Sequence, residues 1–166
     1  MKGSLITLLL TVAFAQSSVF GQAKKDSANL HANAAVALKA VTIHQEVDFK
    51  ASPQRVYEAL LDTKQFSEFS NMSALIDPAV GGAFSIFNKH IIGRNLELIP
   101  NQRIVQAWRV VDWPSGVYSI ARFEFTNQGP GTHLVFDHTA FPENLRDHLA
   151  EGWQLHYWDL LTKYLH

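Results

Sequence analysis

Five strand-like segments follow one another in the second half of the sequence, and the breaks between them are short. The segments cover about residues 83–87, 91–99, 103–112, 117–127 and 132–141. Turn-forming residues fill the later breaks, namely Pro100-Asn101, Trp113-Pro114-Ser115-Gly116 and Gly129-Pro130-Gly131. Parallel neighbours would need a crossover of about a dozen residues or more, so these breaks predict an antiparallel meander.

The residues before the meander predict a strand and two helices. Residues 41–49 alternate in the manner of a strand, and Gln45 is the one polar interruption of the apolar face. That face consists of Val41, Ile43, Val47 and Phe49. Ser52 suits the N-cap of a helix over residues 53–61, which starts with a proline. A second short helix is expected around residues 63–69.

The sequence ends in an expected helix from about residue 143 or 144 to residue 165, which carries an apolar stripe. The stripe consists of Leu145, Leu149, Trp153, Tyr157, Leu160, Leu161 and Tyr164. Gly152 lowers helix propensity by about 1 kcal/mol relative to alanine. Such a residue inside a helix makes sense where the helix must approach the sheet closely, so we expect a close approach at this position. The order of elements predicts an α+β helix-grip fold, in which a curved antiparallel sheet wraps around the long C-terminal helix.

The N-terminal residues carry a different pattern. Lys2 precedes an apolar run over residues 5–15, which is too short to span a bilayer of roughly 30 Å but is typical of a signal-peptide core. Val19 and Gly21 fit a cleavage site, and Ala13 with Ala15 is an alternative. We expect a signal peptide over residues 1–21, a linker over 22–40 rich in Ala, Asn and Ser, and a secreted or periplasmic domain over 41–166. A fortuitous apolar helix in a cytosolic protein is the other interpretation.

Composition excludes several classes of function. The formal net charge is -1, whereas a general nucleic-acid binder would show a basic excess. There is no cysteine, which excludes a disulfide framework, a thiol nucleophile and a cysteine zinc site. The sequence has no H-E-x-x-H pair, nucleophile elbow, Walker loop or G-x-G-x-x-G motif. We therefore expect no metal and no cofactor, and the sequence leans towards a protein without catalytic activity.

Strand alternation selects the side chains that would face the last helix. A cavity enclosed there would be mostly apolar, with a few polar groups that orient a ligand. The predicted ligand-binding residues are Trp108, Ala121, Phe123, Phe125, Phe136, His138, Trp153 and Tyr157. His138 is interpreted as a polar anchor or a general acid/base, or else as a core histidine with a backbone or hydroxyl partner. The tryptophans are likewise interpreted as stacking surfaces or as core packing.

Several segments resemble a known family. Residues 51–60 resemble the helix-opening motif of the SRPBCC (START and birch-allergen-like) superfamily, and Gly81-Gly82-Ala83-Phe84 its glycine-led second strand. Residues 93–100 and 103–109 resemble a motif pair typical of the activator of heat-shock protein 90 ATPase. Two further segments narrow the resemblance to the C-terminal domain of that activator, namely Trp113-Pro114-Ser115-Gly116 and residues 152–158.

These observations lead to three functional hypotheses. The first is an exported SRPBCC domain that binds a small hydrophobic or amphipathic ligand between the sheet and the C-terminal helix. The second, implied by the resemblance, is a co-chaperone-like interaction domain that activates an Hsp90-type ATPase. The third is a cyclase- or hydrolase-type enzyme, also implied by the superfamily, that uses His138 as acid/base. The expected partners are a small hydrophobic ligand and, under the second hypothesis, a chaperone, with no nucleic acid and no membrane span after signal removal.

Overall fold

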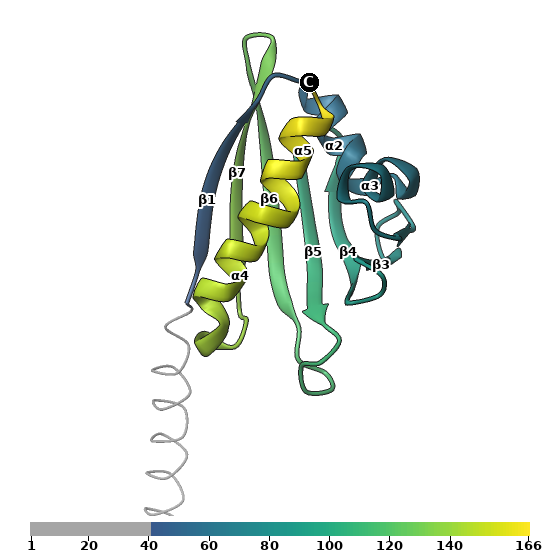
Figure 1. The fold of residues 1–166 in the computed structure, drawn as a ribbon, viewed down its shortest axis with the longest axis vertical. Helices are drawn as coiled ribbons and strands as arrows, with labels where there is room; N and C mark the ends of the chain where they lie inside the picture. The colour runs from purple at the N-terminus through teal and green to yellow at the C-terminus, as the bar shows by residue number, and fades with distance from the viewer. Residues whose placement is uncertain (1–40) are drawn as a thin grey trace, which may run out of the picture. The chain divides into compact units, whose positions relative to one another are not determined.

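The computed structural model describes residues 41–166, so the predicted signal peptide (1–21) and linker (22–40) lie outside the described residues. Seven strands form one sheet in the order β1-β7-β6-β5-β4-β3-β2, and every neighbouring pair is antiparallel (Figure 1). The strands are β1 (Ile43–Phe49), β2 (Leu75–Ile76), β3 (Ala83–Ile86), β4 (Ile91–Ile99), β5 (Arg103–Val110), β6 (Ser119–Gln128) and β7 (Gly131–Thr139). The predicted meander is confirmed, and β2 adds a short edge strand that the sequence pattern did not predict.

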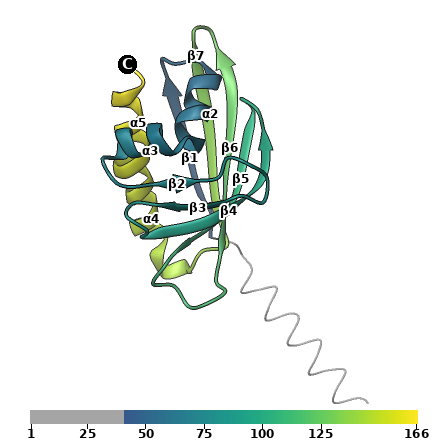
Figure 2. The same ribbon diagram turned by 90° about the vertical axis from the view of Figure 1, so that its right-hand side faces the viewer.

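The helices lie on one side of this sheet (Figure 2). In α2 (Pro53–Leu61), the Ser52 hydroxyl accepts a hydrogen bond from the Arg55 backbone N–H at 3.5 Å, as expected of an N-cap. The remaining helical elements are α3 (Thr63–Ser70), a 3-10 turn (Glu143–Leu145), α4 (Arg146–Trp153), a π-helical turn (Gln154–Trp158) and α5 (Asp159–Tyr164). Within residues 41–166, no helix is long and apolar enough to cross a membrane.

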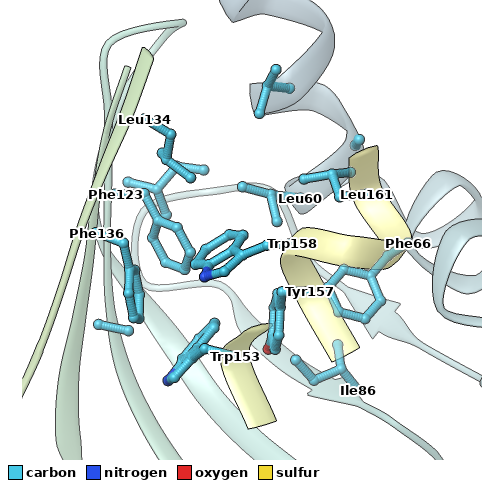
Figure 3. Packing of buried hydrophobic residues seen from close by; sticks show 14 of the residues in the cluster. Leu60, Phe66, Ile86, Phe123, Leu134, Phe136, Trp153, Tyr157, Trp158 and Leu161 are labelled. Carbon is cyan, nitrogen blue, oxygen red and sulfur yellow. The ribbon is translucent and has the colours of Figure 1, made fainter. Parts of the chain in front are cut away.

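The C-terminal helix crosses the sheet and packs its aromatic side chains against it (Figure 1, Figure 3). Trp153 and Trp158 are at most 2% exposed, and the Trp153 ring lies 4.2 Å from the Phe136 ring between centroids. Most sheet residues that alternation places towards the helix are buried, namely Ile104, Gln106, Trp108, Ser119, Ala121, Phe123, Phe125, Leu134, Phe136 and His138. Val110 and Val117 on the same faces are only partly buried, and Ala140 is exposed. The predicted α+β helix-grip fold is therefore confirmed.

Four expected strand ends are wrong by about two residues, and the first is the start of β1, which is Ile43 rather than residue 41. Strand β5 ends at Val110 rather than at 112, and β6 begins at Ser119 rather than at 117. The loop between them turns at Gly116, whose φ of 80° favours glycine. Strand β7 ends at Thr139 because Ala140 has a φ of 61°, which leaves the extended region and exposes its side chain.

The π-helical turn changes the apolar stripe that the sequence predicts. A π turn closes i to i+5 hydrogen bonds and so inserts one residue into the helical repeat. Trp158, which lay outside the predicted stripe, becomes 1% exposed, whereas Leu160 and Tyr164 are only partly buried. The Trp158 indole N–H donates to the Gln45 side-chain oxygen at 2.8 Å, and the Gln45 amide donates to the Ala150 carbonyl at 3.0 Å. Gln45 therefore interrupts its apolar strand face because it ties β1 to this helix.

The expectation that Gly152 brings the helix close to the sheet is wrong. A Cβ added to Gly152 would meet no atom within 4 Å, so the position has free space beside it. The close approach of backbone to neighbouring groups occurs instead at Gly93, where an added Cβ would overlap the Ala107 carbonyl and the Phe84 ring.

Gly152→Ala is expected to stabilise the protein by about 1 kcal/mol, because alanine restores helix propensity and its methyl group meets no neighbour. The check is the free energy of unfolding from urea titrations of the two proteins, measured under identical conditions. Destabilisation of Gly152→Ala would mean that the space beside this helix is smaller than the structure indicates.

Titratable side chains form a continuous row across the exposed faces of β1 and β7. His44 Nδ1 lies 2.7 Å from Asp137 Oδ1, and His44 Nε2 lies 3.2 Å from Glu46 Oε1. The other Glu46 oxygen lies 3.6 Å from His133 Nε2, and His133 Nδ1 lies 2.8 Å from Asp48 Oδ1. The hydrogen bond to Asp137, and then that to Glu46, raises the pKa of His44 above 6.5.

A raised histidine pKa makes the β1–β7 pairing more stable in acid. The contribution of His44 is fully present below its unfolded pKa of about 6.5 and is lost as the pH rises through the higher folded pKa. The stability advantage of the natural protein over His44→Gln should therefore be larger at pH 6 than at pH 9. Urea titrations of both proteins at the two pH values measure this difference, and a larger advantage at pH 9 would contradict it.

Candidate functional site

A pocket of about 710 Å³ lies between the C-terminal helix and strands β4 and β5. Strand residues Ile91, Trp108 and Val110 form one wall, and the 3-10 turn, α4 and the π turn form the opposite wall. The lining residues are Met72, Phe87, His90, Ile91, Trp108, Val110, Asp112, Trp113, Leu145, His148, Leu149, Gly152, Trp153, His156 and Tyr157. The free space beside Gly152 is part of this pocket.

The pocket has an apolar floor and a polar rim. The buried lining residues are Phe87, Ile91, Trp108, Trp113, Leu149, Trp153 and Tyr157. The polar lining residues, which are His90, Asp112, His148 and His156, are exposed. The Trp108 ring meets the Trp113 ring edge to face at 5.7 Å and the Trp153 ring at 5.6 Å between centroids. Aromatic walls arranged in this way suit flat apolar ligands, and the exposed rim suits a ligand with a polar end.

The turn between β3 and β4 forms one side of the pocket in an unusual conformation. Phe87, Asn88 and Lys89 have φ angles of 51°, 55° and 69°, and the left-handed region is unfavourable for a bulky residue such as phenylalanine. The Asn88 side-chain oxygen accepts hydrogen bonds from the Ser73 backbone N–H at 3.0 Å and the Ser73 hydroxyl at 3.1 Å. These bonds hold the turn so that the Phe87 ring packs 5.1 Å from the Tyr157 ring between centroids.

Arg109 positions the loop that carries Trp113. Its guanidinium donates hydrogen bonds to the Trp113 carbonyl at 2.5 Å and to the Val111 carbonyl at 3.1 Å, and it lies 5.6 Å from the Tyr118 ring centroid. This arginine, which the strand pattern alone would leave as a solvated charge, therefore fixes one aromatic wall of the pocket.

His138 is buried behind the pocket and hydrogen-bonded through both ring nitrogens. Trp153 Nε1–H can only donate, so His138 Nδ1 accepts from it at 3.0 Å and Nε2 carries the proton. Nε2–H then donates to the Ser119 hydroxyl at 2.7 Å, and that hydroxyl donates to the Trp108 carbonyl at 2.8 Å. Burial lowers the pKa of His138 to about 3, because the charged form loses its hydration. The arrangement keeps His138 neutral and fixes Trp153, and it matches the core-histidine interpretation.

The eight predicted ligand-binding residues separate into two groups. Trp108, Trp153 and Tyr157 line the pocket. The residues that do not line it are Ala121, Phe123, Phe125, Phe136 and His138, each at most 6% exposed. The space beside Phe123 and Tyr157 holds a separate void of about 10 Å³, about enough for one water molecule. The interior under the middle of the helix is thus packed, and the open space lies towards β4 and β5.

Most pocket residues were not selected by strand alternation. Met72, Phe87 and His90 lie in loops or turns, where alternation gives no direction. His148 and His156 lie in the C-terminal helical segment, where strand alternation does not apply. Across residues 41–166, no group of three or more His, Cys, Asp or Glu side chains is placed to hold a metal ion. A sequence signal for the pocket did exist in Gly152, which opens space in an otherwise bulky helix.

Comparisons with known proteins all match the same family. The sequence model of the family described as "Activator of Hsp90 ATPase homolog 1-like protein" matches residues 50–166. An activator of 90 kDa heat shock protein ATPase homolog from Dictyostelium discoideum is 29% identical over 114 residues, covering 68% of this chain and 30% of that protein. Homolog 1 from Homo sapiens is 24% identical over 111 residues, covering 67% of this chain and 33% of that protein. The chain therefore spans about a third of the length of these curated relatives.

A solved structure has the same fold. The crystal structure of an HSP90 activator from Plasmodium falciparum matches with a TM-score of 0.67 and 24% sequence identity, covering 70% of this chain and 89% of that chain.

Proposed function

Because the chain belongs to the activator of Hsp90 ATPase homolog 1-like family, as its motifs predicted, we propose that it uses this fold to bind a small hydrophobic or amphipathic ligand. The observation that carries the proposal is the pocket of about 710 Å³, with its aromatic floor and polar rim. Ligand sites in proteins are typically concave and apolar, with volumes of roughly 300–1,000 Å³ and a few polar groups. The pocket has each of these properties.

The packing around the pocket supports a role in binding rather than in folding. Hydrophobic interiors are normally filled, and the neighbouring core around Phe123 and Phe136 is packed in this way. Large apolar side chains such as Trp113 and Trp153 would gain more contact by closing on one another than by lining an open space. Gly152 instead leaves open space beside α4, because it has no side chain to fill the pocket.

We further propose that the protein is exported, on the basis of the apolar run over residues 5–15 and the small residues that follow it. The test of both proposals is mass spectrometry of the protein isolated from its own cells under native conditions. We expect a mature N-terminus near Gln22 and an additional mass that is released on denaturation. A full-length chain beginning at Met1 would contradict export, and a pocket that is empty in the isolated protein and takes up no apolar probe would contradict ligand binding.

A second candidate function is activation of an Hsp90-type ATPase, which is what the names of the relatives describe for those proteins. Family membership is the observation that favours it. The test is the ATPase rate of a purified Hsp90-type chaperone with and without this protein. Stimulation that survives closure of the pocket would assign the activity to another surface, whereas no stimulation would leave ligand binding as the function.

A further inference from the structure

The indole N–H of Trp108 stands out among the polar groups of the interior. Trp108 is 3% exposed, and its Nε1 is the one buried side-chain nitrogen or oxygen in the described part of the chain that has no hydrogen-bond partner. Trp153 and Trp158 each donate their N–H to a neighbouring side chain. Leaving a buried donor unpaired is unfavourable, so such a group in a native structure calls for an explanation.

The Tyr157 hydroxyl lies on the helix side of the pocket and interacts with this N–H. Burial raises the pKa of Tyr157 above its usual value, and the interaction with the Trp108 N–H offsets part of that rise. Even so, the Trp108 N–H makes no hydrogen bond of normal geometry. Trp108, from the sheet, and Tyr157, from the helix, both line the pocket, so the unpaired N–H and the Tyr157 hydroxyl lie together just beneath its apolar floor.

The charges around the pocket restrict what these donors can bind. The lining includes no Lys or Arg, and its one carboxylate, Asp112, would repel an anion. The three lining histidines are exposed at the rim and do not form part of the buried floor. A ligand carboxylate placed at the floor would lose its hydration without gaining a counter-ion, which is strongly unfavourable. An uncharged carbonyl oxygen accepts the same hydrogen bonds without that loss.

We infer that the pocket is specific for flat, uncharged aromatic compounds with a carbonyl oxygen, which accepts hydrogen bonds from Trp108 Nε1 and the Tyr157 hydroxyl. The ring system of such a compound lies among Trp108, Trp113 and Trp153. The carbonyl enters as the two donor side chains separate slightly, and rotamer adjustments of this kind are common on binding. The inference rests on the proposed ligand-binding function and names the class of ligand for the same pocket.

The test compares 9-fluorenone with fluorene, two uncharged tricyclic compounds that differ by the carbonyl oxygen. Dissociation constants are measured by quenching of tryptophan fluorescence with the purified full chain. Fluorenone is expected to bind about tenfold more tightly, because its oxygen satisfies a donor that fluorene leaves unpaired. A third probe, 9-oxofluorene-4-carboxylate, should bind more weakly than fluorenone, because its charged group would lose hydration at the apolar floor without gaining a counter-ion.

Two substitutions test whether the donors cause the preference. Tyr157→Phe removes one hydroxyl, and β-(3-benzothienyl)alanine in place of Trp108 replaces the N–H by sulfur while keeping the ring size. Each should reduce the preference for fluorenone several-fold with little effect on fluorene. Trp113→Phe is the matched control, because it trims the aromatic wall without removing a floor donor, so both compounds should weaken and their ratio should stay the same.

The possible outcomes distinguish a failure of the inferred carbonyl preference from a failure of the proposed ligand-binding function. Equal binding of fluorenone and fluorene by the natural protein, or a preference unchanged in both donor variants, would overturn the inference while leaving a ligand pocket. Tighter binding of the carboxylate would overturn the choice of an uncharged ligand. Binding of neither fluorenone, fluorene nor any other apolar probe would overturn the proposed function itself.

Discussion

His138→Ala is expected to lower the free energy of unfolding by about 3–5 kcal/mol. The substitution leaves a cavity where a fully buried ring had packed against the rings of Trp108 and Phe141, each 5.0 Å away between centroids. It also removes the acceptor of the Trp153 N–H, which would remain buried and unpaired. The measurement is the unfolding free energy at pH 7.5 from urea titrations followed by tryptophan fluorescence.

The pH dependence of this effect distinguishes a neutral structural histidine from a charged one. The folded pKa of about 3 lies below the unfolded value of 6.5, so the unfolded state binds the extra proton first as the pH falls. The stability that His138 provides is therefore complete above pH 6.5 and declines between pH 6.5 and 3. His138→Leu is the matched control because it fills much of the volume and cannot titrate. The difference in stability between the natural protein and His138→Leu should shrink below pH 6.5, and a constant difference would contradict the assigned neutral state.

The second large effect is expected on ligand binding. Gly152→Phe places a ring in the open space beside α4, where an added Cβ meets no atom within 4 Å. The ring should fill much of the pocket and weaken binding of N-phenyl-1-naphthylamine, an uncharged fluorescent probe, by about 100-fold or more, because the probe loses its burial against the aromatic floor. The expected free energy of unfolding is unchanged or slightly raised, since glycine is a poor residue for a helix interior. Fluorescence titration measures the binding, and thermal unfolding measures the fold.

Gly152→Ala serves as the control for pocket closure because its methyl group occupies little of the space. It should bind the probe nearly as well as the natural protein. Ala121 is a less suitable position for closing the pocket, since it is fully buried in the packed interior and a larger side chain there would strain the core. Unchanged probe binding by Gly152→Phe would show that the probe binds elsewhere.

Much of the fold follows from local patterns in the sequence. The alternation of residues 117–125 and 132–138 placed Phe123, Phe125 and Phe136 on the buried face because side chains of a strand point to opposite sides in turn. Ser52 begins α2 as expected because a hydroxyl there satisfies a free backbone N–H. Strand ends were less predictable, because Ala140 leaves the sheet through a left-handed φ that alanine rarely adopts.

The local patterns of the sequence predicted only part of the candidate site. Trp108, Trp153 and Tyr157 were selected because they lie on inner faces, and all three line the pocket. Phe87 was not selected, because its direction depends on a turn held by the contact between Asn88 and Ser73. Trp158 was not included in the predicted apolar stripe, because a single π turn shifts which residues of the helix face the sheet. The 3.6-residue repeat of the sequence does not predict that turn.

The sequence by itself determined the order of elements, the buried faces and the family, because these depend on periodicity, turn chemistry and short motifs within single segments. Only the tertiary structure decided where the protein is filled and where it is open. The pocket is lined by residues from 72 to 157, and empty space depends on how distant side chains fit together. It also decided the role of His138, whose pairing with Trp153 and Ser119 joins a helix to two strands.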